Sequence, residues 1–243
     1  MILILGGTTE AAALARLLAG RPGIPAMLSL AGRTQNPAPP PIPYRVGGFG
    51  GVEGLSTFLR ERRARAMVDA THPFAEQMSA QAVAAAQRTG VQLLALRRPA
   101  WRAEPRDNWT EVADAEAAAV ALGSEPRRVF LTTGRLELPA FLAAPHHFYL
   151  VRSVDAPEEL PPHARLILAR GPFAEEDELA LMREERIEVV VTKNSGGSAT
   201  YGKIVAARRL GLPVILLKRP EVAEVETVTT AEEALAWIER RLG

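Results

Sequence analysis

The chain has 243 residues, of which 47% are apolar, and it can therefore bury a sizeable core as one large or two small domains. Its 29 basic and 28 acidic side chains are spread along the whole length, so there is no basic tail or stripe to suggest a nucleic-acid partner. A small-molecule ligand is favoured instead. The absence of cysteine excludes disulfides and thiolate metal ligands, and it fits a cytoplasmic protein.

Short apolar runs alternate with helical stretches rich in Ala, Glu and Arg, which is the pattern of βα units around a parallel sheet. No apolar run is long enough to span a membrane. In the first half the sequence predicts strands at 2–5, 26–31, 44–46, 66–70 and 92–96. Helices are predicted between them at 9–19, 52–63 and 74–89.

The second half follows the same pattern. The sequence predicts strands at 129–132, 148–152, 166–169, 188–191 and 214–217, then a closing helix at 231–242. Residues 101–108, which follow Pro99, are the expected hinge between the halves. We therefore predict a Rossmann-like nucleotide-binding domain at 1–100 and a second Rossmann-like domain at 101–243 that contributes to substrate binding.

An internal repeat supports this division. Three pairs of matching residues lie 121 positions apart: Thr71 and Thr192, Gly90 and Gly211, Pro99 and Pro220. The polar loops after the matched apolar runs differ, which is typical of one scaffold used twice with two binding surfaces. Ligands of parallel sheets bind beyond the carboxyl ends of the strands. We therefore predict an α/β fold of two parallel-sheet halves related by the repeat, with the active site in the cleft between them.

The first loop, Gly6-Gly7-Thr8-Thr9-Glu10-Ala11, is similar to the dinucleotide fingerprint G-x-G-x-x-G/A, with Thr8 at the second glycine. Amide groups at the start of a helix and the Thr8 hydroxyl suit a phosphate. The alternative is an ordinary βα turn that needs glycine for its φ angles. The second strand runs into Gly32-Arg33-Thr34, where an acidic residue would indicate NADH. Arg33 and Thr34 suit the 2′-phosphate of NADPH, although Arg33 is also explained as a solvated loop charge.

The loop Thr71-His72-Pro73-Phe74 precedes a predicted helix, which Thr71 or His72 would cap. His72 is a candidate proton donor, and its alternative role is capping or packing. The other three histidines show no ligand spacing, so no metal site is expected.

The second loop offers Lys193, Asn194 and Ser195 at an expected helix N-terminus, where an ammonium, an amide and a hydroxyl suit carboxylates or phosphates. Residues 197–203 fit G-x-x-x-x-G-K, but Ile204 stands where a nucleotide-binding P-loop needs Ser or Thr. The repeat also aligns Lys203 with the interior of the first-copy helix. A phosphotransferase that uses Lys203 is therefore the weaker alternative.

Four segments together resemble the precorrin-6A reductase family of cobalamin biosynthesis, and the resemblance covers essentially the whole chain. They are Gly6–Ala11, Asp69–Ala75, Thr133–Arg135 and Val191–Gly197. The resemblance implies reduction of one double bond of precorrin-6A, an anionic tetrapyrrole, by a nicotinamide nucleotide to give precorrin-6B. It does not separate cobalt-free from cobalt-containing substrates. A non-catalytic NADPH-binding protein remains a second alternative.

The residue assignments follow from these loops and the resemblance. The expected NADPH-binding residues are Gly6, Gly7, Thr8, Thr9, Gly32, Arg33, Thr34, Thr71, His72 and Phe74. The expected substrate-binding residues are Arg97, Arg135, Lys193, Asn194, Ser195, Gly196 and Lys203. His72 or water would supply the proton that follows hydride transfer. A monomer or small homo-oligomer is expected.

Overall fold

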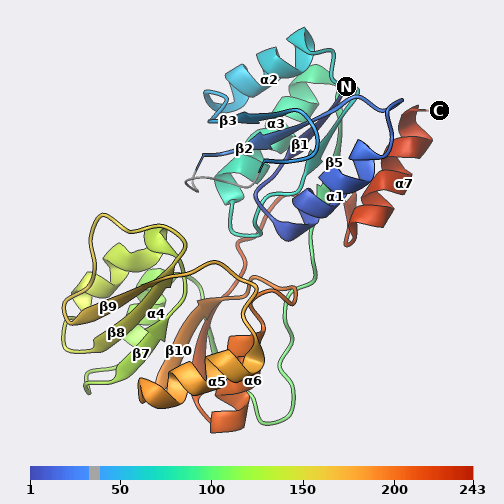
Figure 1. The fold of residues 1–243 in the computed structure, drawn as a ribbon. Helices are drawn as coiled ribbons and strands as arrows, with labels where there is room; N and C mark the ends of the chain where they lie inside the picture. The colour runs from blue at the N-terminus through green and yellow to red at the C-terminus, as the bar shows by residue number, and fades with distance from the viewer. Residues whose placement is uncertain (33–38, 243) are drawn as a thin grey trace. The chain divides into compact units, whose positions relative to one another are not determined.

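The computed structural model describes residues 1–32 and 39–242, and the chain forms two compact units (Figure 1). Unit 1 comprises Met1–Pro99 and Pro220–Gly243, and unit 2 comprises Ala100–Arg219. Each unit is built on a six-stranded sheet in which all recorded strand pairs are parallel. The predicted α/β fold of two parallel-sheet halves is confirmed.

Unit 1 has the sheet order β12-β5-β4-β1-β2-β3. Its first part contains β1 (Ile2–Leu5), α1 (Thr9–Ala19), β2 (Ala26–Leu30), β3 (Tyr44–Val46), α2 (Gly51–Glu61), β4 (Ala66–Asp69), α3 (Glu76–Thr89) and β5 (Gln92–Leu96). Its second part contains β12 (Thr227–Val228) and α7 (Ala231–Leu242). In the centre of the sheet, Ile2 is in register with Ala26 of β2 and Ala66 of β4.

The central strand β1 explains how unit 1 is layered. Ile2 and Ile4 belong to one core cluster with residues of α1 and α7, whereas Leu3 and Leu5 belong to another with residues of α2 and α3. Successive side chains of a strand point to opposite faces, so helices cover both faces of this sheet. A strand buried on both sides has to be apolar at every position, which is why it appears as an unbroken apolar run.

Unit 2 has the sheet order β6-β11-β10-β7-β8-β9. It contains β6 (Asn108–Val112), α4 (Ala115–Ala121), β7 (Arg128–Leu131), the 3₁₀ helix η1 (Arg135–Ala143), β8 (Phe148–Ser153), β9 (Ala164–Leu168), α5 (Glu175–Glu184), β10 (Val189–Lys193), α6 (Gly202–Leu210) and β11 (Pro213–Leu217). Phe130 of β7 packs in the core cluster of α5 and α6. Phe141 of η1 packs against Tyr149 of β8 in an edge-to-face contact, with 5.9 Å between the ring centroids.

The repeat is visible in the two sheets. The order β5-β4-β1-β2-β3 in unit 1 corresponds strand by strand to the order β11-β10-β7-β8-β9 in unit 2. Within the repeat, β4, α3 and β5 match β10, α6 and β11. Gly90 ends α3 and Gly211 ends α6, with φ of +73° and +69°. This left-handed conformation is favourable only for glycine at a helix C-terminus. The matched glycines are therefore explained by the same chain reversal used twice.

The two edge strands are exchanged between the units. After β5 the chain passes Pro99 and forms β6, which pairs with β11 of unit 2. After β11 it passes Pro220 and forms β12, which pairs with β5 of unit 1. The matching prolines of the repeat thus mark the two crossovers.

This exchange changes the predicted domain boundary. Residues 220–243 belong to unit 1 and not to the second domain predicted at 101–243. The physical reason is long-range packing: α7 contacts α1, and Trp237 and Ile238 are buried in the core cluster of unit 1. The expected hinge at 101–108 also differs, because Trp101 is buried in the core of unit 2 and β6 begins at Asn108. No described helix has the length and apolar character needed to cross a membrane.

A core substitution tests the assignment of α7 to unit 1. Ile238→Ala should lower the free energy of unfolding by about 2–5 kcal/mol, because it opens a cavity at a fully buried position. Native-state hydrogen exchange should show the lost protection in β1 and α1. Val120→Ala, at a position of unit 2 that is 80% exposed, should change stability by less than about 0.5 kcal/mol. Lost protection in β10 and β11 with none in β1 would contradict the assignment.

Candidate functional site

The turn after β1 requires glycine for structural reasons. Gly7 has φ of +122°, and a Cβ on Gly6 would lie 2.6 Å from Cδ1 of Leu28. The backbone N–H of Gly6 donates to the carbonyl of Ser29 at 2.9 Å, which continues the pairing with β2. The alternative of an ordinary βα turn therefore explains both glycines, and a phosphate-binding role for them stays a prediction.

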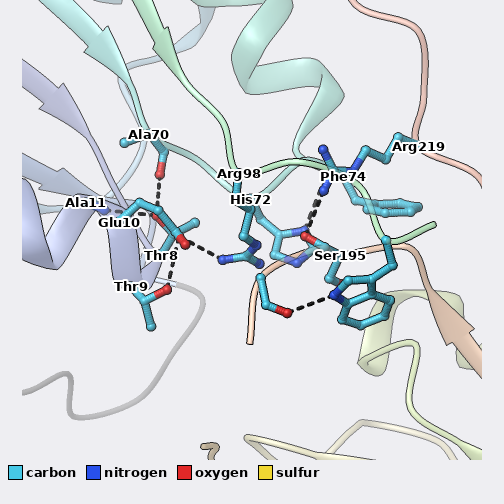
Figure 2. Close-up of polar contacts among 12 residues, drawn as sticks. Thr8, Thr9, Glu10, Ala11, Ala70, His72, Phe74, Arg98, Ser195 and Arg219 are labelled. Carbon is cyan, nitrogen blue, oxygen red and sulfur yellow. Dashed lines mark hydrogen bonds and ion pairs between the residues drawn. The ribbon is translucent and has the colours of Figure 1, made fainter. Parts of the chain in front are cut away.

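Thr8 caps α1 and links it to β4 (Figure 2). Its Oγ1 accepts a hydrogen bond from Ala11 N at 3.1 Å and donates to the carbonyl of Ala70 at 2.8 Å. Because a hydroxyl has a single proton, this donor is already used within the protein. An anion at this turn would therefore be held by amide groups at the start of α1 and not by the Thr8 hydroxyl that we expected to donate.

An acidic residue lies in the first turn of α1. The Glu10 carboxylate accepts from Oγ1 of Thr9 at 3.0 Å and pairs with Arg98 at 2.8 Å (Figure 2). Both charged side chains are mostly buried, with 20% and 14% of their surfaces exposed. Arg98 thereby offsets a negative charge beside the expected phosphate position. Sequence reasoning did not identify this pair, whose members lie 88 residues apart.

The expected 2′-phosphate site is only partly described. Gly32, two residues after the last residue of β2, has φ of +74°, a conformation that favours glycine. Arg33 and Thr34 lie outside the described residues, so their role in NADPH recognition stays a prediction.

A buried carboxylate organises the loop after β4. Asp69 is 2% exposed and accepts from N and Oγ1 of Thr71, at 3.1 and 2.6 Å, and from Oγ of Ser79 at 2.6 Å. Arg97 pairs with the same carboxylate at 3.4 Å and supplies the compensating charge. Arg97, which we expected to bind the substrate, is thus paired with Asp69 within the protein. Asp69 was not among the predicted site residues, although an acidic residue that ends an apolar strand is a usable signal.

His72 does not cap α3 as expected, and neither does Thr71. The helix begins at Glu76 after Ala75, because His72 and Pro73 lie in a turn closed by a hydrogen bond from Ala75 N to the carbonyl of His72 at 2.7 Å. Nδ1 of His72 accepts from Phe74 N at 3.2 Å. A neutral imidazole with this contact carries its proton on Nε2 and can donate a hydrogen bond there, whereas transfer of a proton requires the imidazolium, whose protonated Nδ1 no longer accepts from Phe74 N. The rings of His72 and Phe74 lie 5.8 Å apart.

In unit 2, Lys193 and Arg135 lie at or after the ends of neighbouring strands: Lys193 is the last residue of β10, and Arg135 begins η1, four residues after the last residue of β7. The Lys193 ammonium pairs with Glu137 of η1 at 2.5 Å. The expected substrate cation therefore has a carboxylate partner that sequence reasoning missed. Arg135 is exposed at the start of η1. Gly196 has φ of +68°, a conformation that explains a glycine there.

Asn194 and Ser195 are tied to the two crossovers. Oδ1 of Asn194 accepts from Trp101 N at 2.8 Å, and Nδ2 donates to the Trp101 carbonyl at 3.1 Å. Arg219 donates to the carbonyls of Asn194 at 2.9 Å and Ser195 at 3.0 Å; Figure 2 shows the contact with Ser195. Asn194 is 6% exposed, so its amide has a structural role in place of the expected contact with a ring carboxylate. Lys193, Asn194 and Ser195 do not lie at a helix N-terminus as expected, because α6 begins only at Gly202.

Lys203 faces the interior of unit 2 and is 3% exposed. Its Nζ donates to the carbonyl of Thr200 at 2.9 Å, close to the buried ion pair of Arg152 and Glu178. Burial, and then the charge of Arg152, lower the pKa of Lys203 from 10.5 to about 7. The structure contradicts the expected contact between Lys203 and the substrate, and it also removes the lysine on which the phosphotransferase alternative depends. Within residues 1–32 and 39–242, no group of acidic or histidine side chains forms a possible metal site.

Comparison with known proteins gives one consistent family. Residues 1–239 match the family model described as "Precorrin-6x reductase CbiJ/CobK". A precorrin-6A reductase of Sinorhizobium sp is 55% identical over 96% of this chain and 90% of that relative. A cobalt-precorrin-6A reductase of Priestia megaterium is 32% identical over 97% of this chain and 96% of that relative. The solved structure "CobK precorrin-6A reductase" is 49% identical, covers 99% of this chain and 96% of its own, and has a TM-score of 0.93.

The pH dependence of stability tests the buried position of Lys203. The folded-state pKa of about 7 lies below the ordinary value of 10.5, so between these values the unfolded chain binds a proton that the folded chain does not. The free energy of unfolding should therefore rise with pH in this window through Lys203. Urea denaturation at pH 7 and pH 9.5 should show the wild-type protein gaining stability relative to Lys203→Met. Lys218→Met removes a lysine of unit 2 that is 58% exposed and should leave the slope unchanged. Equal slopes for wild type and Lys203→Met would contradict the burial.

Proposed function

Because the chain belongs to the precorrin-6x reductase family, we propose that it catalyses the NADPH-dependent reduction of precorrin-6A to precorrin-6B in cobalamin biosynthesis. The observation that carries the proposal is the family match over residues 1–239. The four motif segments that suggested this family lie directly after β1, β4, β7 and β10 or at their ends. Parallel sheets bind their ligands at this end of the strands.

The proposal names the cobalt-free macrocycle as the substrate. Five relatives named precorrin-6A reductase are 46–55% identical to the chain over at least 96% of its length. Three relatives named cobalt-precorrin-6A reductase are 30–32% identical. Higher similarity to the first group supports a substrate without cobalt.

The proposed cofactor is NADPH, which when bound supplies the hydride. The turn at Gly6 and Gly7 fits a dinucleotide, because it leads directly into α1 without a side chain on either residue. Amide groups at the start of α1 would hold the diphosphate. The sequence Arg33-Thr34 supports NADPH over NADH, since a guanidinium and a hydroxyl suit a 2′-phosphate.

The protein's own residues would orient the two reactants and deliver one proton. Asp69 holds Thr71 and with it the backbone that leads to His72. As the imidazolium, which gives up the bond from Phe74 N to Nδ1, His72 would donate its Nε2 proton to the ring carbon adjacent to the one that receives the hydride, and it would be left as the neutral imidazole. Lys193 and the exposed Arg135 would contact the acetate and propionate groups of the macrocycle.

A turnover assay tests the activity. NADPH should be oxidised only when precorrin-6A is supplied, with one NADPH consumed per macrocycle and a product heavier by two hydrogen atoms. NADH should support the reaction less well. A thermal-shift comparison should show stabilisation by NADPH and none by ATP with magnesium. Binding of NADPH without its oxidation would instead support the non-catalytic alternative.

Substitution of His72 tests the proton donor. His72→Ala should lower kcat about 10²–10⁴-fold, the usual contribution of general acid catalysis, and it should also raise the Kd for NADPH, because His72 is among the residues expected to hold the cofactor. Steady-state kinetics with precorrin-6A and a direct titration with NADPH measure the two effects. His146→Ala removes an exposed histidine outside the four motif segments and should retain full activity. Near-normal turnover of His72→Ala would assign protonation to water.

A further inference from the structure

Trp101 is the second residue of unit 2 after the first crossover, and the loop between β10 and α6 folds around it. Its backbone N–H and carbonyl both bond the amide of Asn194, at 2.8 and 3.1 Å. Its indole Nε1–H donates to the carbonyl of Gly197 at 2.8 Å. Every conventional hydrogen-bonding group of Trp101 is thus used by the beginning and middle of this loop.

The later part of the loop contacts the Trp101 ring. The ring of Tyr201 lies 5.6 Å from it, between centroids, and Nζ of Lys203 lies 5.3 Å from the centre of the ring. The carbonyl of Thr200 accepts from the same ammonium at 2.9 Å. Trp101 therefore contacts the chain at positions from Asn194 to Lys203. It is 9% exposed, so these contacts are largely shielded from water.

The loop needs such a support because its own sequence does not favour one conformation. Gly196 and Gly197 both have positive φ, of +68° and +70°, and glycine loses more conformational freedom on ordering than any other residue. In unit 1 the corresponding loop is held by the buried carboxylate of Asp69. The repeat places Val190 at that position in unit 2, and its side chain has no hydrogen-bonding group.

The other two tryptophans provide a contrast. The indole N–H groups of Trp109 and Trp237 are buried and have no hydrogen-bond partner in the described part of the chain. Trp109 is also in unit 2, on β6, and packs against the same core cluster as Trp101. Hydrogen bonding to a functional loop thus distinguishes Trp101 from a tryptophan in the same core.

We propose that Trp101 is a positioning residue for the reductase reaction, which fixes the loop of residues 194–201 and thereby places Lys193 and Ser195 for the carboxylates of the macrocycle. The inference rests on the proposed function. It assigns the effect of Trp101 to substrate binding and not to NADPH binding, because the residues expected to hold NADPH all belong to unit 1.

The first test needs no substrate. Trp101→Phe keeps an aromatic ring but removes the bond to Gly197, whereas Trp109→Phe removes an indole that has no partner. Hydrogen exchange of a peptide covering residues 194–201 should be at least about threefold faster in Trp101→Phe than in Trp109→Phe. Asn194→Ala, which frees the backbone of Trp101 and leaves its indole in place, should also accelerate exchange. Unchanged exchange in both Trp101→Phe and Asn194→Ala would overturn the proposal.

The second test uses turnover. Trp101→Phe should raise the KM for precorrin-6A roughly 3–10-fold, the worth of one hydrogen bond, with a smaller change in kcat and an unchanged Kd for NADPH. Trp109→Phe should leave the KM unaltered. Faster exchange without a change in this KM would overturn the positioning role, as would equal effects on precorrin-6A and NADPH. If the wild-type protein does not reduce precorrin-6A, the proposed function fails before either variant is compared, and this inference fails with it.

Discussion

The exchange of edge strands is the constraint on which the rest of the structure depends. Each sheet receives its outermost strand from chain that has just left the other sheet, β6 beside β11 and β12 beside β5. Unit 2 is one continuous stretch, Ala100–Arg219, whereas unit 1 is assembled from two stretches, Met1–Pro99 and Pro220–Gly243. Because all strands of a parallel sheet end at the same edge, both crossovers leave from the edge that carries the motif loops. Chain continuity thus brings Pro99 and Pro220 next to the expected binding residues.

The residues before each crossover use this proximity in different ways. Arg98 and Arg219 occupy matching positions of the repeat, yet Arg98 pairs with a carboxylate of α1 whereas Arg219 donates to two loop carbonyls. The loops themselves are also stabilised differently, by the Asp69 carboxylate in one unit and by Trp101 in the other. The repeat therefore preserves backbone architecture, while the polar contacts at the strand ends have diverged. This is the expected outcome when two copies of a scaffold serve two ligands.

Sequence patterns predicted most readily the helices and strands that bury apolar side chains on one or both faces. The bounds of β1, β5, α1 and α7 agree with the predictions, because an apolar run or a capped, periodic segment marks each of them. The bounds of the edge strand β3 agree as well, although none of its residues is buried. β6 was not predicted, since an edge strand without a fully buried residue has no apolar run to reveal it. The assignment of α7 to unit 1 depends on contacts with α1, more than 200 residues earlier, and no local pattern contains that information.

For the candidate site, the sequence identified the loops better than the roles of their side chains. Asn194 and Lys203 have the chemistry of ligand-binding groups, but residue type alone does not say whether the partner is a ligand or the protein. The partner of Asn194 is Trp101, 93 positions away, and it is available only because the crossover enters unit 2 at that point. A buried amide or ammonium must have its hydrogen bonds satisfied within the fold before it can serve a substrate. Burial therefore assigns both residues to the support of the loop. Recognition of the macrocycle by exposed side chains such as Arg135 stays a proposal.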